Sequence, residues 1–160
     1  MQLDTVRFGQ IVIDDSKIIK FASGIPGLEH LKNFVLLHFA ETEPICWLQA
    51  VEDKNISLPV VDPFIIREDY ALDVGDREVA EIEAKSPQDL HIVNVVVIPE
   101  DLQQMTANLA APILINVHKN LGRQIVLDGK DYPVRYPIFA AIAKYLQEVA
   151  ADAGVEQKSE

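Results

Sequence analysis

Short apolar runs, many of them alternating with polar residues, recur along the chain and are typical of β-strands. Gly, Pro, Asn and Asp interrupt the runs at close intervals, which favours short strands joined by tight turns. The run over residues 90–98 is rich in β-branched side chains, as expected for a buried central strand. The predicted strands cover residues 3–8, 10–13, 17–21, 33–39, 46–51, 56–61, 64–67, 90–98, 113–118, 123–127 and 132–136.

Helical periodicity is strongest near the end of the chain. Apolar residues recur there every three or four positions from Ile138 to Val149, and Pro137 suits the first position of a helix. Residues 128–131 predict a turn between strands. The last residues, 151–160, are small and polar and predict a frayed tail, so that residues 1–150 form a single domain.

The order of the elements restricts the fold class. No predicted strands alternate with helices of 10–15 residues, which disfavours a doubly wound α/β fold. A curled sheet leaves few open edges and suits many short strands. The sequence therefore predicts a mainly β protein, a small curled antiparallel sheet or β-barrel-like domain with short helical turns and a C-terminal helix.

Residues 68–89 differ from the rest of the chain in their charge. They include eight acidic residues against two basic ones, more than half of the net charge of −11 of the whole chain. The apolar positions Val79 and Ile82 fit either a strand or a helix, and we favour an exposed edge strand or excursion, because charge on an edge discourages association between sheets. The segment is either a solvated face or a docking surface for a basic protein.

The sign of the charge also restricts the partners. Nucleic-acid binding depends on Lys and Arg side chains that displace counterions from phosphates, and this chain of 160 residues has 14 basic against 25 acidic residues. We therefore expect no direct binding of nucleic acid, and long-range attraction favours a basic protein partner. Two copies repel each other, so we expect a monomer or a weak dimer.

The single cysteine excludes a disulfide within the chain and favours a reducing compartment. The first residues lack the pattern of a signal peptide, and the apolar runs are shorter than a membrane span. These observations predict a cytoplasmic protein that does not bind membranes.

Sequence motifs of nucleotide binding and of serine hydrolases are absent, and the four histidines lack metal-ligand spacing. We therefore predict no catalytic residues, no metal and no cofactor. Cys46 could still meet a histidine in three dimensions, but its apolar neighbours favour a place in the core. Trp47 could stack on a ligand, and its neighbours again favour core packing.

Several strings in the chain together resemble one family, the flagellar assembly factor FliW. They follow one another over residues 5–136. After Gln49 the family often has Ser where this chain has Ala50, and neither residues 75–89 nor the C-terminal helix match a family motif. The matching strings are Phe21-Ala22-Ser23-Gly24-Ile25-Pro26-Gly27-Leu28-Glu29, Trp47-Leu48-Gln49, Val61-Asp62-Pro63, Glu68-Asp69-Tyr70, Thr106-Ala107-Asn108-Leu109-Ala110-Ala111-Pro112-Ile113, Ile115-Asn116 and Gly122-Arg123-Gln124.

The resemblance implies a small bacterial, cytoplasmic, non-enzymatic protein with a β-barrel-like fold. Members of the family are expected to bind flagellin and the RNA-binding translational regulator CsrA. Bound CsrA is kept off the flagellin message, and flagellin that accumulates displaces it. The implied function is a partner switch that couples flagellin synthesis to flagellar assembly.

Two sets of residues are candidates for partner binding. The loop residues Ile25 and Pro26 form the smaller set, for which a rigid turn is the simpler explanation. The larger set is expected to attract CsrA by its charge. Its members are Glu68, Asp69, Asp73, Asp76, Glu78, Glu81 and Glu83.

Two alternative functions stay open. The protein could chaperone flagellin without antagonising CsrA. It could also be a barrel that holds a small apolar ligand in its interior, as some small barrels do. In that case four aromatic side chains would line a cavity instead of filling a core. They are Phe34, Phe39, Trp47 and Phe64.

Overall fold

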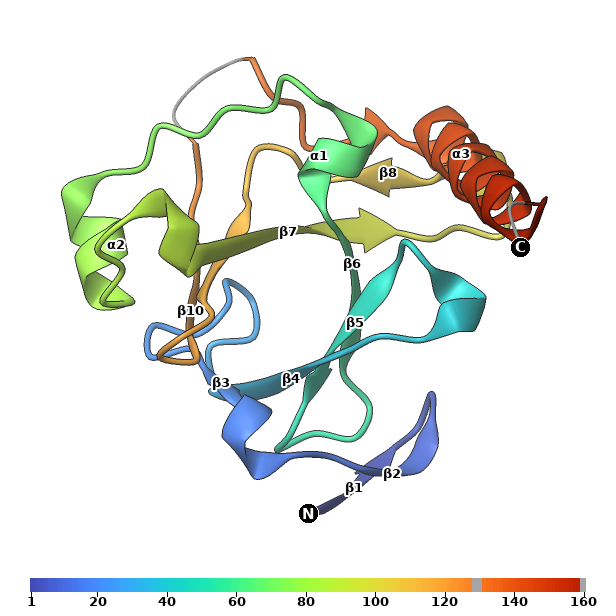
Figure 1. Ribbon diagram of the computed structural model, residues 1–160. Coiled ribbons are helices and arrows are strands. Elements are labelled where there is room, and N and C mark those ends of the chain that lie inside the picture. The colour runs from blue at the N-terminus through green and yellow to red at the C-terminus, as the bar shows by residue number, and fades with distance from the viewer. Residues whose placement is uncertain (128–130, 159–160) are drawn as a thin grey trace.

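Seven β-strands close into a barrel in the computed structural model, which describes residues 1–127 and 131–158 (Figure 1). They follow the order β7-β6-β5-β4-β3-β10-β9, and β9 returns to β7. Neighbouring strands are antiparallel except β3 and β10, which are parallel. The strands are β3 (Ile19–Lys20), β4 (Asn33–Leu37), β5 (Cys46–Ala50), β6 (Ser57–Val61), β7 (Leu90–Val97), β9 (Ile113–Asn116) and β10 (Leu121–Gln124).

Strand β7 belongs to both the barrel and a smaller extension of the sheet. Its first residues, from Leu90 to Val93, pair with β9, and its last residues, Val96 and Val97, pair with β8. Strand β11 continues this extension beyond β8, whereas β1 and β2 form a separate hairpin. These strands are β1 (Gln2–Thr5), β2 (Gly9–Val12), β8 (Thr106–Ala107) and β11 (Tyr136–Pro137).

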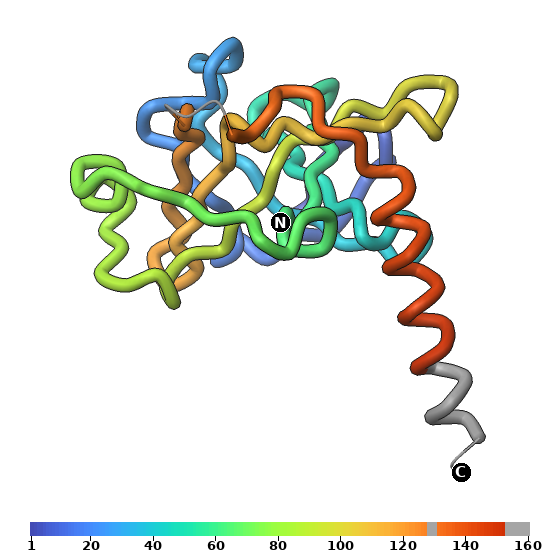
Figure 2. The backbone as a smooth tube through the Cα atoms, turned by 90° about the horizontal axis from the view of Figure 1, so that it is seen from above, coloured from blue at the N-terminus to red at the C-terminus, as the bar shows by residue number. Residues whose placement is uncertain are grey.

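Helices occupy the outside of the barrel. Helices α1 and α3 are in contact with each other, and α3 also touches η4. Seen from above, α3 extends away from the rest of the molecule (Figure 2). The helices are α1 (Pro63–Ile66), α2 (Asp76–Glu81) and α3 (Phe139–Lys158), and the 3₁₀ helices are η1 (Asp15–Lys17), η2 (Ala40–Thr42), η3 (Pro87–Asp89) and η4 (Leu102–Gln104).

Alternate residues of the strands face two different cores, because successive side chains of a strand point to opposite faces. In β5, Leu48 packs with Phe34 and Phe21 in one cluster, to which strands around the barrel contribute. Trp47, its neighbour, packs in a second cluster with Ile138, which directly precedes α3. The strands are therefore covered on both faces, by the barrel interior and by the layer that contains α1 and α3.

The mainly β, barrel-like fold with a C-terminal helix is confirmed, but three predicted strands are wrong. Of residues 132–136 only Tyr136 is in a strand, where it pairs in β11. Residues 64–67 belong largely to α1, because the Asp62 carboxylate accepts a hydrogen bond from the Phe64 N–H at 2.9 Å and Pro63 occupies the first helical position. Of the two expectations for residues 68–89, the edge strand is wrong and the excursion holds. The excursion contains helix α2, whose first turn has the acidic residues that the helix dipole favours.

The C-terminal helix begins two residues later than predicted, since Pro137 pairs in β11 and α3 starts at Phe139. Helix α3 continues to Lys158, and residues 159 and 160 lie outside the described residues. The division between a domain of residues 1–150 and a frayed tail of residues 151–160 therefore stays a prediction. The predicted turn over residues 128–131 lies mostly outside the described residues.

Candidate functional site

Residues 68–89, which we call the acidic segment, run across the outside of the barrel from α1 to β7, and α2 lies beside β10 (Figure 1). Ile82 anchors the segment, because its side chain is only 1% exposed and packs against Leu114 and Ile125. The Asn116 side-chain amide donates a hydrogen bond of 2.8 Å to the carbonyl of Ile82. The acidic segment is therefore held against the barrel.

Glu81 joins three parts of the chain. Its carboxylate forms an ion pair with Arg123 of β10 and accepts a hydrogen bond from the Ser23 hydroxyl. Ser23 belongs to the glycine-containing loop that precedes β4, so the two predicted binding sets lie side by side. Because Arg123 compensates the charge of Glu81, this carboxylate adds little to the negative potential outside the acidic segment. Its role is to hold the acidic segment in position.

Most of the other predicted acidic residues face solvent. Asp69 is paired with Arg67, whose Nε lies 3.0 Å from the carboxylate. Within residues 1–127 and 131–158, no ion pair is found for the remaining five, and only Glu78 of these is half-buried. Their uncompensated charge gives this side of the barrel a negative potential. They are Glu68, Asp73, Asp76, Glu78 and Glu83.

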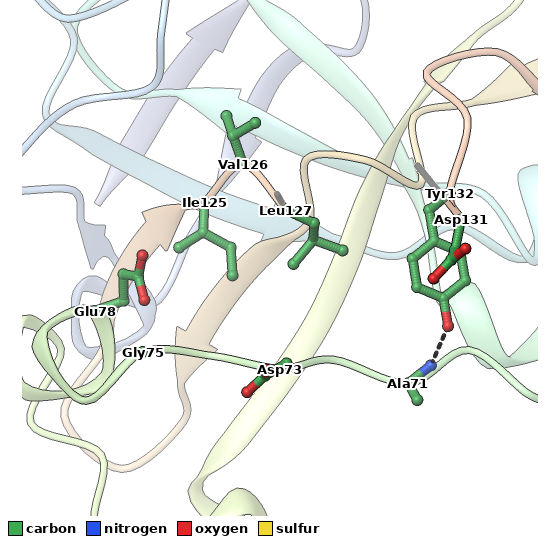
Figure 3. A pocket seen from close by; sticks show the side chains of 9 residues that line it. All are labelled: Ala71, Asp73, Gly75, Glu78, Ile125, Val126, Leu127, Asp131 and Tyr132. Atoms are coloured by element: carbon green, nitrogen blue, oxygen red, sulfur yellow. Dashed lines mark hydrogen bonds between the residues drawn. The ribbon is translucent and has the colours of Figure 1, made fainter. Parts of the chain in front are cut away.

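A hollow of about 630 Å³ opens between the acidic segment and the chain that follows β10 (Figure 3). The side chains of Ile125 and Leu127 point from that chain toward residues 71–75. The Tyr132 side chain extends across the hollow to the acidic segment, where its hydroxyl accepts a hydrogen bond of 2.8 Å from the Ala71 N–H. Carboxylates complete the lining, and they belong to Asp73, Glu78 and Asp131.

The lining combines an apolar wall with carboxylates. A lysine or arginine side chain suits such a hollow, because its aliphatic stem packs on apolar groups while its charged end binds a carboxylate. The same carboxylates repel phosphate groups. The chemistry of the hollow therefore favours a basic protein surface over a nucleic acid.

The loop with Ile25 and Pro26 is a tight, rigid structure. Gly24 has φ +73°, and a Cβ at this position would lie 2.7 Å from the Cα of Glu29, so glycine is required. The Ile25 side chain is 3% exposed and packs in the barrel core, whereas Pro26 is exposed. Of the two predicted loop residues, only Pro26 has its side chain exposed to solvent.

The four aromatic residues of the small-ligand alternative do not line a common cavity. Phe34 is buried among the side chains that fill the barrel, with its ring 5.3 Å from that of Phe21. Phe39 and Trp47 pack on the other face of the sheet, and Phe64 is 46% exposed on α1. The interior of a barrel of this size is filled by its own side chains, as observed here.

Cys46 and His38 do meet in three dimensions, with Sγ and Nδ1 3.0 Å apart. Burial raises the pKa of the Cys46 thiol, and the carboxylates of Glu43 and Asp62 raise this pKa further. A reactive cysteine needs the opposite shift, because the thiolate is the nucleophile. The contact therefore gives no support to a catalytic role.

Several residues of the hollow were not predicted. Ile125 and Leu127 belong to a predicted strand and Tyr132 to another, and nothing in their local sequence indicates a binding surface. They border the acidic segment because the barrel brings the chain that follows β10 against it, where Ile125 and Leu127 pack in one cluster with Ile82. Arg67, whose guanidinium lies 4.8 Å from the centre of the Tyr132 ring, was likewise missed.

Two further observations concern metals and membranes. Among the described residues, no group of three or more His, Cys, Asp or Glu side chains is arranged to hold a metal ion. In the same part of the chain, every helix is too short or too polar to cross a membrane.

The fold and the site together define a class: small closed β-barrels with a filled interior and an acidic outer surface. Comparisons with known proteins narrow the class. The sequence profile of the family described as FliW protein matches residues 2–138. The chain belongs to the FliW family of flagellar assembly factors, and the resemblance found in the sequence is confirmed.

Individual relatives agree with this assignment. The flagellar assembly factor FliW of Caldicellulosiruptor bescii is 46% identical over 132 residues, which are 82% of this chain and 86% of the relative. That of Clostridium kluyveri is 40% identical over 139 residues, covering 87% and 96% of the two chains. A crystal structure of the flagellar assembly factor FliW superposes with a TM-score of 0.81 at 33% identity, covering 87% of this chain and 97% of that one.

Proposed function

We propose that this protein binds the translational regulator CsrA through the acidic segment and so relieves repression of flagellin synthesis. The observation that carries the proposal is the set of uncompensated carboxylates beside a hollow that suits Lys or Arg. A protein that binds RNA presents basic groups to phosphate. An acidic surface attracts such a protein and places negative potential next to its RNA-binding groups.

The anchoring of the acidic segment supports this function. Ile82 and Glu81 hold the segment on the barrel before any partner arrives. Binding then requires little ordering of the backbone, which reduces the entropic cost of association. Carboxylates held in place also keep the negative potential directed outward, so that it steers a basic partner during approach.

Flagellin is the second proposed partner, and the cytoplasm is the proposed compartment. The support is membership of a family of flagellar assembly factors, to which the relatives from Caldicellulosiruptor and Clostridium also belong. In this scheme flagellin that has not been exported occupies the protein and releases CsrA. The protein then acts as a switch between its two partners, binds no nucleic acid itself and works as a monomer or weak dimer.

The test removes charge from the acidic segment without changing its shape. A variant with Asp73→Asn, Asp76→Asn and Glu78→Gln keeps the anchor at Glu81 intact. A control with Asp4→Asn, Glu41→Gln and Glu100→Gln removes the same charge from exposed sites elsewhere. Binding of CsrA is followed by stopped-flow or biolayer interferometry at low salt.

We expect the acidic-segment variant to slow association with CsrA by about tenfold and the control to change it by less than about twofold. Equal effects of the two variants would mean that only net charge matters and that the acidic segment is not the site. Binding of flagellin without any binding of CsrA would leave a chaperone and remove the regulatory function.

A further inference from the structure

Helix α3 has an apolar stripe that the rest of the molecule covers only at its beginning. Ile142 is buried against the layer outside the barrel. Leu146 and Val149 follow it by four and seven positions and so lie on the same face of the helix. Each of these two side chains is 45% exposed, and the helix leaves the barrel in this region (Figure 2). The stripe therefore continues uncovered into solvent.

A groove between α1 and α3 adjoins this stripe. It has a volume of about 390 Å³, and its walls include Phe64 of α1 and Tyr145 of α3. The Phe64 ring packs edge-on against Tyr70 with ring centres 6.2 Å apart, so its position is fixed although it is partly exposed. Large, partly exposed apolar side chains on both sides of a groove are typical of sites that receive a helix.

The charges beside the groove indicate the kind of partner. Glu68 and Glu148 both line it, and Lys144, the one cation among the described residues of its lining, lies 4.0 Å from Glu148. Asp152 is exposed one turn farther along α3. The local excess of carboxylates suits Lys or Arg on a partner. A second copy with its own net charge of −11 would be repelled.

We propose that the groove and the uncovered stripe form one docking surface for an amphipathic helix of another protein, with Lys or Arg beside the apolar face of that helix. The residues of this docking surface are Phe64, Glu68, Tyr145, Leu146, Glu148 and Val149. A helix suits the surface because residues three and four apart on one helix pack into the groove of another. The family match ends at residue 138, so α3 is a feature of this chain beyond that match.

The experiment uses a fluorescent synthetic peptide of about 18 residues, long enough to span some 27 Å as a helix. Leucines occupy one helical face and lysines the rest. One control peptide replaces every lysine by glutamate, and another has the same composition in scrambled order. Binding to the full chain is measured by fluorescence anisotropy, in the absence of CsrA and flagellin.

The matching protein variants act on two faces of the same helix. Leu146→Ser with Val149→Ser removes apolar groups from the docking surface, whereas Gln147→Ser with Ala151→Ser alters exposed positions on the opposite face. We expect saturable binding of the Leu/Lys peptide, weakened at least about tenfold by the first pair, since burying the exposed part of each side chain contributes about a factor of four or more. The second pair should change the affinity by less than about twofold. Circular dichroism checks that both variants fold.

Four results would overturn the proposal. They are equal binding of the scrambled peptide, equal binding of the glutamate peptide, equal effects of the two variant pairs, and a dimer in sedimentation that the Leu146→Ser and Val149→Ser changes abolish. The last result would make a second copy the occupant. None of these measurements involves CsrA, so the outcome is separate from that for the acidic segment.

Discussion

Gly122 shows how closely one residue can be specified by its surroundings. It lies in β10 against the Phe21 ring, and a Cβ at this position would be 2.5 Å from a ring carbon. Because Phe21 is fully buried in the barrel core, its ring has no free space into which to move. The close packing of strand and ring therefore requires glycine here.

We predict that Gly122→Ala lowers the free energy of unfolding by about 1–3 kcal/mol, the usual cost of overpacking a core. Urea titration followed by Trp47 fluorescence measures the change. Gly75→Ala is the control, because its added Cβ would meet only the end of the flexible Glu78 side chain. A loss of stability in Gly75→Ala as large as that in Gly122→Ala would contradict the explanation.

Asp89 links stability to pH at the scale of a single carboxylate. Hydrogen bonds from the backbone N–H groups of Lys85 and Ser86, together with nearby His118, hold the pKa of Asp89 below its usual value. A pKa that is lower in the folded than in the unfolded state means that the charged form stabilises the fold. This contribution is complete above the unfolded pKa, near pH 4, and is lost as pH falls through the folded pKa.

The Asp89→Asn variant should therefore melt below the wild type at pH 6, and the difference should shrink as the pH is lowered toward 2.5. The neutral side chain lacks the charge whose loss destabilises the wild type in acid. Thermal melting at a series of pH values tests this expectation. A difference in melting temperature that stays constant over the whole range would show that Asp89 does not contribute through its charge.

At the scale of elements, α1 depends on its first residues. Four residues make a marginal helix, and the Asp62 cap satisfies one of the N–H groups that such a helix leaves free. We predict that Asp62→Ala lowers the free energy of unfolding by about 1 kcal/mol. Asp62→Ser keeps a side-chain oxygen that can cap the helix, so it should lower the free energy of unfolding by no more than about a few tenths of a kcal/mol. Chemical denaturation of both variants measures the effect, and equal losses would argue against capping.

Several elements could be predicted from the sequence and others could not. The expected strands at residues 46–51 and 90–98 agree within one residue with β5 and β7, because their apolar and β-branched patterns coincide with buried positions. At residues 64–67 the same pattern was misleading, because the Asp62 cap and Pro63 at the first helical position favour a helix. For α2, the apolar spacing of Val79 and Ile82 fits both structures, and the acidic residues of the first turn, Asp76 and Glu78, favour the helix.

At the scale of the whole molecule, the net charge of −11 should govern how quickly a basic partner arrives. We predict that raising the salt concentration from about 50 to about 300 mM slows association with CsrA by roughly tenfold or more. The dissociation rate should change much less. Rates measured at several salt concentrations test this. A salt effect confined to dissociation would contradict long-range attraction.

The binding role of the predicted acidic residues stays a prediction, and the structure adds residues around them that the sequence does not indicate. The sequence indicates the acidic residues, but the pairing of Glu81 with Arg123, 42 positions away, exists only in the closed barrel. The burial of Ile25 and the approach of Tyr132 to Ala71 also depend on contacts between distant parts of the chain. Local patterns report which residues are charged or apolar, and the topology decides which of them meet.

Strand β7 has a consequence for how the protein unfolds. It pairs with β6 along one edge and, along the other, first with β9 and then with β8. The barrel and the layer next to α3 thus share one continuous backbone, and loss of β7 would expose both cores at once. The two parts are expected to melt in a single cooperative transition rather than one after the other.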